Sequence, residues 1–302
     1  MSAQPRILVI GATGAQGGSV ARHLLAEGRY RVRCLTRSLD SVAAIALADA
    51  GAEVVEGDMA DRDSLDAALA GCEAVFGVTN YFEHLDAEYA LGKQLLDAVV
   101  DSAVEHLVLS TLPSARALSS GELDVPHFEQ KARLEALVRQ KEIFATFVHV
   151  AFYYENFLNN CPPRKQDNGT YAFGFPLGDA VLSAVSVKDV GGVVAAILRK
   201  PEAFQGKTVN IVGDQRTAAE YAAIIGAVTG RAVRYQHIPR DVFASLPIPA
   251  AAALADMFEL YRSHVRANPA DLAESLRCCP AIRSFEHWAC EHREALLSAM
   301  DA

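Results

Sequence analysis

The strongest constraint on the fold is an apolar run that meets three regularly spaced glycines near the start of the sequence. Arg6–Ile10 (RILVI) is typical of a strand buried on both faces of a parallel sheet. A G-x-x-G-x-x-G spacing follows at once, and a helical pattern begins after it. Glycines here allow a tight turn and let the backbone approach a pyrophosphate, to which the helix N-terminus offers free N–H donors. We therefore expect a dinucleotide-binding loop, rather than a plain strand-to-helix turn, made of Gly11, Ala12, Thr13, Gly14, Ala15, Gln16 and Gly17.

Short apolar runs alternate with helical patterns through the first 150 residues. This alternation is typical of βαβ units and a parallel sheet. The predicted strands after the first are Tyr30–Thr36, Glu53–Glu56, Ala74–Val78, His106–Ser110 and Ala145–Val150. The predicted helices are Ser19–Glu27, Asp63–Ala70, Asp86–Ser102 and Pro126–Lys141. The fold class is therefore α/β, with a Rossmann-type, doubly wound parallel sheet.

The regular alternation ends after residue 150. Residues 161–180 are rich in glycine and proline, which predicts a loop-rich segment. A helical pattern returns at Val187–Arg199, a strand is predicted at Lys207–Val212, and the chain from Thr217 onward is largely helical.

Two interleaved domains follow from this layout. We expect residues 1–150, joined by about 186–213, to form the Rossmann domain that binds the dinucleotide. Residues 151–302 should form a smaller, mainly helical C-terminal lobe.

Composition argues against several classes of protein. Net charge is −9, from 28 Lys and Arg against 37 Asp and Glu, so direct nucleic-acid binding is not expected. The six cysteines lack the paired spacing of a zinc site, so we expect no metal and a reducing compartment. No stretch has the form of a signal peptide or approaches the ~20 apolar residues that span a bilayer. A soluble, cytoplasmic protein without membrane contact is the expectation.

Residues after the next strands predict which dinucleotide binds. Arg37 follows the second strand, where an acidic residue would accept the 2′-hydroxyl of NAD and an arginine suits a 2′-phosphate. This indicates NADP(H), unless Arg37 is a solvated surface residue. Asp58 can bond the adenine amino group, or it can serve only as a turn or cap carboxylate. Further expected contacts at the ends of the third and fourth strands are Met59, Thr79, Asn80 and Tyr81, although Asn80 could stabilise only its local turn.

Several motifs together resemble the atypical short-chain dehydrogenase/reductases of the NmrA-like family, and most of all its NADPH-sensor branch. The motifs are GATGAQGGSVARHLL at 11–25, GAEVVEGD at 51–58, VTNY at 78–81, HFEQK at 127–131, FYYENFL at 152–158, SVKDVGGVV at 186–194 and TAAEYAAI at 217–224. They are specific in combination and extend over nearly the whole chain.

The resemblance implies further contacts with NADP(H). It assigns the ribose of the nicotinamide to Lys131, and it adds Tyr153, Tyr154, Glu155 and Asn156. The tyrosines could instead be core aromatics, and Glu155 and Asn156 could only cap the next helix.

The same family also implies a catalytic pair, which this chain carries in altered form. Relatives have Tyr-x-x-x-Lys, in which the tyrosine donates a proton and the lysine lowers its pKa. Here His127 stands in the tyrosine position, one helical turn from Lys131, and Ser110 or Thr111 loosely matches the usual serine. Imidazole can act as an acid or base near neutrality, but a nearby lysine disfavours its protonated form. His127 and Lys131 are therefore candidate catalytic residues, and a packed histidine is the alternative.

Two functions fit these observations. One is a redox-sensing regulator, in which NADP(H) occupancy alters binding to a protein partner or assembly into a homodimer. The other is an NADPH-dependent reductase of a small quinone, enone or similar acceptor.

Overall fold

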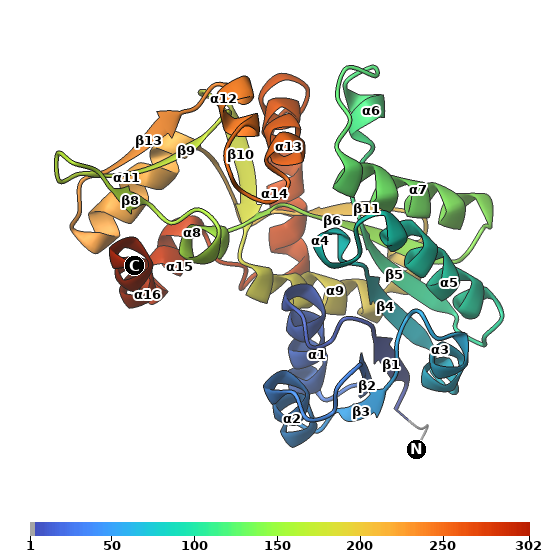
Figure 1. The fold of residues 1–302 in the computed structure, drawn as a ribbon. Helices are drawn as coiled ribbons and strands as arrows, with labels where there is room; N and C mark the ends of the chain where they lie inside the picture. Colours follow the sequence, from blue (N-terminus) through green and yellow to red (C-terminus); the bar gives the residue numbers. More distant parts are fainter. Residues whose placement is uncertain (1–3) are drawn as a thin grey trace. The chain divides into compact units, whose positions relative to one another are not determined.

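The computed structural model describes residues 4–302, which divide into two compact units built from interleaved segments (Figure 1). The first, called here the Rossmann unit, comprises the chain up to Pro113 together with Gln130–Val150 and Lys188–Asn210. The second, called the C-terminal unit, comprises Ser114–Glu129, Ala151–Val187 and Ile211–Ala302. The sequence pattern did not indicate that residues 114–129, which lie within the expected first domain, belong to the C-terminal unit.

A seven-stranded sheet forms the centre of the Rossmann unit, in the order β11-β6-β5-β4-β1-β2-β3. Its strands are β1 (Arg6–Val9), β2 (Arg31–Thr36), β3 (Glu53–Glu56), β4 (Ala74–Val78), β5 (His106–Thr111), β6 (Ala145–Val150) and β11 (Thr208–Ile211). The pairs β1–β2, β2–β3, β1–β4, β4–β5 and β5–β6 all run parallel. The strand order reverses at β1, which pairs with β2 on one side and β4 on the other. In open α/β sheets, ligands bind at this switch point, beyond the carboxyl ends of the strands.

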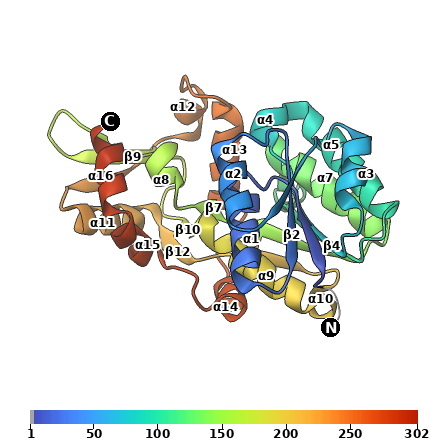
Figure 2. The ribbon, with the colours of Figure 1, turned by 90° about the horizontal axis from the view of Figure 1, so that it is seen from below.

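Helices cover both faces of this sheet. They are α1 (Ala15–Glu27), α2 (Val42–Asp49), α3 (Arg62–Leu69), α4 (Tyr81–His84), α5 (Glu88–Val100), α7 (Pro126–Gln140), α9 (Val190–Arg199) and α10 (Pro201–Phe204), with a 3-10 turn η1 (Leu85–Ala87). Figure 2 shows α1 and α9 on one face, and α3, α5 and α7 on the other. Leucines and valines from α3, α5 and α7 join those of the strands in one buried cluster. The fold class expected from the sequence, a doubly wound parallel sheet, is confirmed.

Helices α1 and α9 pack closely because glycine and serine lie at their contact. A methyl group added to Gly191 would lie 2.3 Å from the carbonyl oxygen of Ser19, so no larger residue fits. The hydroxyl of Ser19 donates to the carbonyl of Lys188 at 2.7 Å and accepts from the amide of Gly191 at 2.9 Å. The late segment 188–210 is in this way fixed to the first helix of the chain.

The C-terminal unit holds two small sheets as well as helices. One sheet has the order β12-β10-β7 and the other β13-β9-β8. Its strands are β7 (Phe152–Tyr153), β8 (Arg164–Lys165), β9 (Tyr171–Phe175), β10 (Val181–Val185), β12 (Asp214–Thr217) and β13 (Val233–His237). Its helices are α6 (Ala115–Leu118), α8 (Asn156–Asn159), α11 (Ala218–Thr229), α12 (Arg240–Ala244), α13 (Ala251–Ser263), α14 (Pro269–Cys278), α15 (Phe285–Glu291) and α16 (Arg293–Asp301). The mainly helical lobe is confirmed, but the loop expected over 161–180 contains β8 and β9.

Aromatic side chains fill the core of the C-terminal unit. Trp288, Tyr154, Tyr221, Phe157 and Phe285 are among the largest fully buried side chains. The rings of Tyr221 and Phe285 meet edge to face with centroids 4.6 Å apart, a geometry that aromatic pairs favour.

Neither a membrane span nor a metal cluster is found among residues 4–302. None of the helices there has the length and apolar character needed to cross a bilayer. No set of three or more His, Cys, Asp or Glu side chains in that range is placed to hold a metal ion.

Candidate nucleotide-binding site

The glycine loop joins the carboxyl end of β1 to the first turn of α1. Gly11 has a φ of +69°, a region that favours glycine. The amide of Gly14 donates to the carbonyl of Gly11 at 2.9 Å, which closes the turn. A methyl group on Gly17 would lie 2.2 Å from the same carbonyl oxygen, so the helix can start this close to the strand only with glycine there.

The start of α1 is suited to an anion. Its N-cap is Gly14, which has no side chain to satisfy the first amides, and its first turn carries no acidic residue. The first turn of a helix has N–H groups without partners in the helix itself, and it carries the positive end of the helix dipole; both lie here at the switch point of the sheet. This local chemistry fits a pyrophosphate.

Arg37 comes directly after β2 and lies in an ion pair that the sequence did not predict. Its Nη2 is 2.5 Å from Oε1 of Glu83, which belongs to the short helix α4 after β4. The guanidinium beside Glu83 holds the pKa of that carboxyl below its usual value, against a smaller opposing effect of burial. More than half of the Arg37 side chain is exposed, so the guanidinium is accessible to a ligand.

Asp58 and Met59 form a turn after β3. One carboxylate oxygen of Asp58 accepts from the amide of Ala60 at 2.9 Å. The amide of Asp58 donates to Oγ of Ser64 at 3.0 Å, and the carbonyl of Met59 accepts from Gln94 at 2.9 Å. The carboxylate thus has the turn role that the sequence left open, and its contact with an adenine stays a prediction.

Lys131 lies in a buried polar cluster at the end of β4. Its ammonium donates to the carbonyl and hydroxyl oxygens of Thr79, at 2.7 and 3.0 Å, and lies 2.7 Å from Oε1 of Glu88. The same Oε1 accepts from the Thr79 hydroxyl at 2.6 Å. Burial lowers the pKa of Lys131, and Glu88 opposes that shift. The structure brings Lys131 and Thr79 together, and Glu88 is a member of the cluster that the sequence did not predict. Contact of Lys131 and Thr79 with a nucleotide stays a prediction.

His127 lies one turn before Lys131 on α7 but belongs to the C-terminal unit. Its imidazole is buried, and its ring meets that of Phe128 edge to face at 5.1 Å. The ring of Phe128 in turn lies 6.2 Å from that of Tyr261. Packing of this kind agrees with the alternative of a packed histidine, and a catalytic role for His127 stays a prediction.

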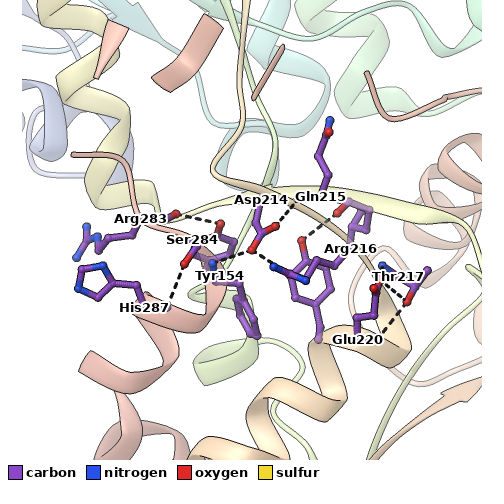
Figure 3. A network of polar contacts seen from close by, with 12 residues as sticks. Tyr154, Asp214, Gln215, Arg216, Thr217, Glu220, Arg283, Ser284 and His287 are labelled. Carbon is purple, nitrogen blue, oxygen red and sulfur yellow. Dashed lines mark hydrogen bonds and ion pairs between the residues drawn. The ribbon is translucent and has the colours of Figure 1, made fainter. Parts of the chain in front are cut away.

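Tyr153, Tyr154, Glu155 and Asn156 all lie in the C-terminal unit. The hydroxyl of Tyr154 donates to the carbonyl of Arg283 at 3.2 Å within the polar network of Figure 3, and its ring is fully buried. Glu155 accepts from the Ser186 hydroxyl at 2.6 Å and the Val187 amide at 3.0 Å.

The other two residues of this group lie in regular elements. Tyr153 ends β7, where it pairs with Val185, and Asn156 begins α8. The sequence left a core role open for the two tyrosines and a helix-capping role open for Glu155 and Asn156. Tyr154 is a buried core residue, whereas the side chain of Glu155 makes no capping bond to α8 and binds Ser186 and Val187 instead. Their contact with a cofactor stays a prediction.

A second polar cluster joins α7 to the ends of β5 and β6. Glu135 accepts from the Thr111 hydroxyl at 2.6 Å, and its other oxygen lies 2.8 Å from the Arg139 guanidinium. Nε2 of His149 lies 2.9 Å from Glu135. Burial opposes ionisation of this carboxyl, but these donors outweigh it and lower its pKa to about 2. Thr111 therefore bonds to Glu135, and the neighbouring Ser110 is buried.

The acidic partners Glu83, Glu88 and Glu135 gave no local signal in the sequence. Each lies on a helix, where a glutamate is ordinarily a surface residue. Glu83 and Glu88 pair with residues distant in the chain, and Glu135 binds Thr111 and His149 from two strands as well as Arg139 on its own helix. A buried acid could be suspected only for Glu88, which begins a helix whose inward face is otherwise small or apolar.

Comparison with known proteins gives a family match. The model of the NmrA-like family matches residues 3–289. An NmrA-like family domain-containing protein of Dictyostelium discoideum is 28% identical, with 94% of this chain and 96% of that protein covered. The NmrA-like family domain-containing oxidoreductase FrzB of Cladobotryum sp is 32% identical, with 77% of this chain and 76% of that protein covered.

A solved structure shares the fold. NmrA, a negative transcriptional regulator in complex with NADP, superimposes with a TM-score of 0.84 at 21% identity, over 99% of each chain. At this identity the likeness concerns the fold.

Proposed function

The chain belongs to the NmrA-like family, and from this premise we propose that its Rossmann unit binds NADP(H). One observation carries the proposal: the glycine loop at the switch point and Arg37 at the end of the neighbouring strand lie in the same unit. A glycine loop at a helix N-terminus suits the pyrophosphate, and a guanidinium suits the 2′-phosphate. NmrA was solved with NADP and also with NAD, which supports a nicotinamide dinucleotide here, and the preference for NADP(H) rests on Arg37.

Each residue of the site would have a separate task. Amides of Gly11–Gly17 bind the pyrophosphate, Arg37 binds the 2′-phosphate, and Asp58 orients the adenine. Thr79, Asn80 and Tyr81 line the path between the two ends of the cofactor. Lys131 holds the nicotinamide ribose. The bound cofactor supplies hydride chemistry, and these side chains bind and orient it.

We infer that cofactor state regulates binding to a protein partner. Two features support a sensor over a catalyst. His127 stands where relatives have a proton-donating tyrosine, and Glu88 lies 2.7 Å from Lys131 and compensates its charge. An uncompensated ammonium would lower the pKa of a tyrosine at position 127, but here that position holds a histidine and the ammonium is paired, so the arrangement that activates the tyrosine of relatives is altered at both residues. A cytosolic location would give such a protein access to the NADP(H) pool.

A reductase of a small quinone or enone is the second candidate. The oxidoreductase name of the relative FrzB favours it, because that relative is 32% identical to this chain. In this case His127 would donate the proton that accompanies hydride transfer.

Cofactor titration and turnover together test these functions. NADPH should bind the purified protein and NADH should bind more weakly; absence of binding by NADPH and NADP⁺ would contradict both functions. NADPH oxidation is then followed with a panel of quinones, enones and aldehydes. Turnover that is lost in His127→Ala would favour the reductase. No turnover, together with a change in oligomer size or protease sensitivity on adding NADPH, would favour the sensor.

A further inference from the structure

The ion pair between Arg37 and Glu83 places a carboxylate at the group that should receive the 2′-phosphate. Arg37 follows β2 and Glu83 lies in α4, so 46 positions of sequence separate two atoms that are 2.5 Å apart. The other carboxylate oxygen of Glu83 accepts from the side-chain amide of Asn80 at 3.4 Å. The carboxylate is therefore held on the guanidinium by the segment that follows β4.

A carboxylate and a phosphate use the same chemistry to bind arginine. Each presents oxygens that accept from the planar guanidinium fork. Both groups are negative. While Glu83 remains on Arg37, its carboxylate therefore repels a 2′-phosphate that approaches the guanidinium. Because Arg37 holds the pKa of Glu83 below its usual value, protonation does not remove this repulsion near neutral pH.

We propose, on the basis of the proposed NADP(H) binding, that Glu83 is an internal competitor for the 2′-phosphate and so limits the preference of the site for NADP(H) over NAD(H). NADP(H) must displace the carboxylate from Arg37. NAD(H) lacks the phosphate and leaves the ion pair intact.

Displacement of Glu83 would also change the contacts of α4, the short helix to which it belongs. Helix α4 is a single turn. The amides of Glu83 and His84 donate to the carbonyl of Asn80 at 3.3 and 3.1 Å, and the amide of Leu85 donates to the carbonyl of Tyr81. Leu85 follows with a φ of +46°, which is unfavourable for a side chain of this kind. The phosphorylated cofactor alone would therefore change the contacts of α4, which gives a sensor a means to distinguish NADP(H) from NAD(H).

Single substitutions of carboxylate by amide test the competition. Glu83→Gln removes the charge and keeps the size of the side chain. An exposed ion pair contributes up to about a fivefold change in an equilibrium constant, and the repulsion between carboxylate and phosphate adds to this. The variant should therefore bind NADPH about three- to tenfold more tightly than the wild type. Affinity for NADH should stay within about twofold. Asp86→Asn is the matched control, because Asp86 is an exposed acid of the same segment, and it should bind NADPH like the wild type.

A double variant shows whether the effect passes through Arg37. In Arg37→Ala, NADPH should bind more than tenfold more weakly, and adding Glu83→Gln should restore nothing. Calorimetric titration of the wild type, the three single variants and the double variant with NADPH and NADH gives all the values. Unchanged or weaker NADPH binding by Glu83→Gln, or an equal gain for NADH, would overturn the competition. If the wild type binds NADPH and Glu83→Gln has no effect, only this inference fails; if the wild type does not bind NADPH, the proposed function fails with it.

Discussion

At the scale of single residues, the loop after β1 tolerates a side chain at some glycines and not at others. A methyl group on Gly14 would lie 3.3 Å from the carbonyl oxygen of Gly11, which a shift of a few tenths of an ångström can relieve. The same group on Gly17 would meet that oxygen at 2.2 Å and the carbonyl carbon at 2.5 Å. Gly17 thus has a packing role in addition to its place in the motif.

Gly17→Ala should therefore destabilise the protein by about 1–3 kcal/mol, as overpacking does, and weaken NADPH binding by more than about tenfold. Urea denaturation and calorimetric titration measure the two effects. Gly14→Ala is the control and should lose less stability. Equal stability of the two variants would show that the loop relaxes easily around Gly17.

Glu88 should be the most important partner of Lys131, because both charges are buried. Removing one charge of a buried pair leaves the other uncompensated and costs about 3–5 kcal/mol. Glu88→Gln should show a loss of this size in urea denaturation at pH 7. The double variant Glu88→Gln/Lys131→Met removes both charges and should recover much of the loss. Wild-type stability in the single variant would contradict a charged Lys131 in the folded protein.

At the scale of elements, Glu135 connects α7 with three strands through side chains. Its donors come from β5 (Thr111), β6 (His149) and α7 itself (Arg139), and the hydroxyl of Thr208 on β11 lies 3.3 Å away. Four elements therefore depend on the ionised form of one carboxylate.

This dependence predicts acid sensitivity. The pKa of Glu135 is lowered from 4.5 to about 2 in the folded protein, so its ionisation stabilises the fold above about pH 4.5. That contribution, about 1–2 kcal/mol after allowance for solvent screening, is lost as pH falls from about 4.5 towards 2. The stability gap between wild type and Glu135→Gln should shrink over this range in urea denaturation. Glu105→Gln, an exposed control, should show no such trend, and a constant gap for Glu135→Gln would disprove the assignment.

Most strands of the Rossmann unit could be predicted because burial on both faces gives continuous apolar runs. The predicted strands Ala74–Val78 and Ala145–Val150 coincide with β4 and β6, which are mainly buried. Glu53–Glu56 coincides with β3, although this edge strand has only exposed and half-buried residues. Helix α2 was not predicted, since its sequence VAAIALAD is apolar all round and has no helical period. Strand β9 was also missed, because Gly174 interrupts the run YAFGF although its residues alternate between buried and half-buried.

Within the candidate site, the sequence could identify residues whose positions follow from a local motif. It could not identify residues whose role depends on an ion pair with a residue distant in the chain. The glycine loop and Lys131 have positions set by local spacing, and Arg37 by the end of a strand. Glu83 and Glu88 become recognisable only when β4 is placed beside β1 and α7 is packed on the sheet. Their partners lie 46 and 43 positions away in the chain.

At the scale of the whole molecule, cofactor binding should appear as stabilisation. A ligand at 100 times its Kd raises the free energy of unfolding by about 2.7 kcal/mol. NADPH should therefore raise the unfolding temperature in differential scanning fluorimetry, and NADH at the same concentration should raise it less. Arg37→Ala should respond equally to the two nucleotides. Equal stabilisation of the wild type by both would contradict a 2′-phosphate site.

The interleaving of the two units has a consequence for how the protein can be divided. Residues 1–150 contain the whole glycine loop and six strands, yet they lack β11 and α9. Helix α9 is buried along most of its length, so a fragment that ends at Val150 would leave the surface it covers open to water. We therefore expect that no single cut of the chain yields a fragment that folds and binds the nucleotide by itself.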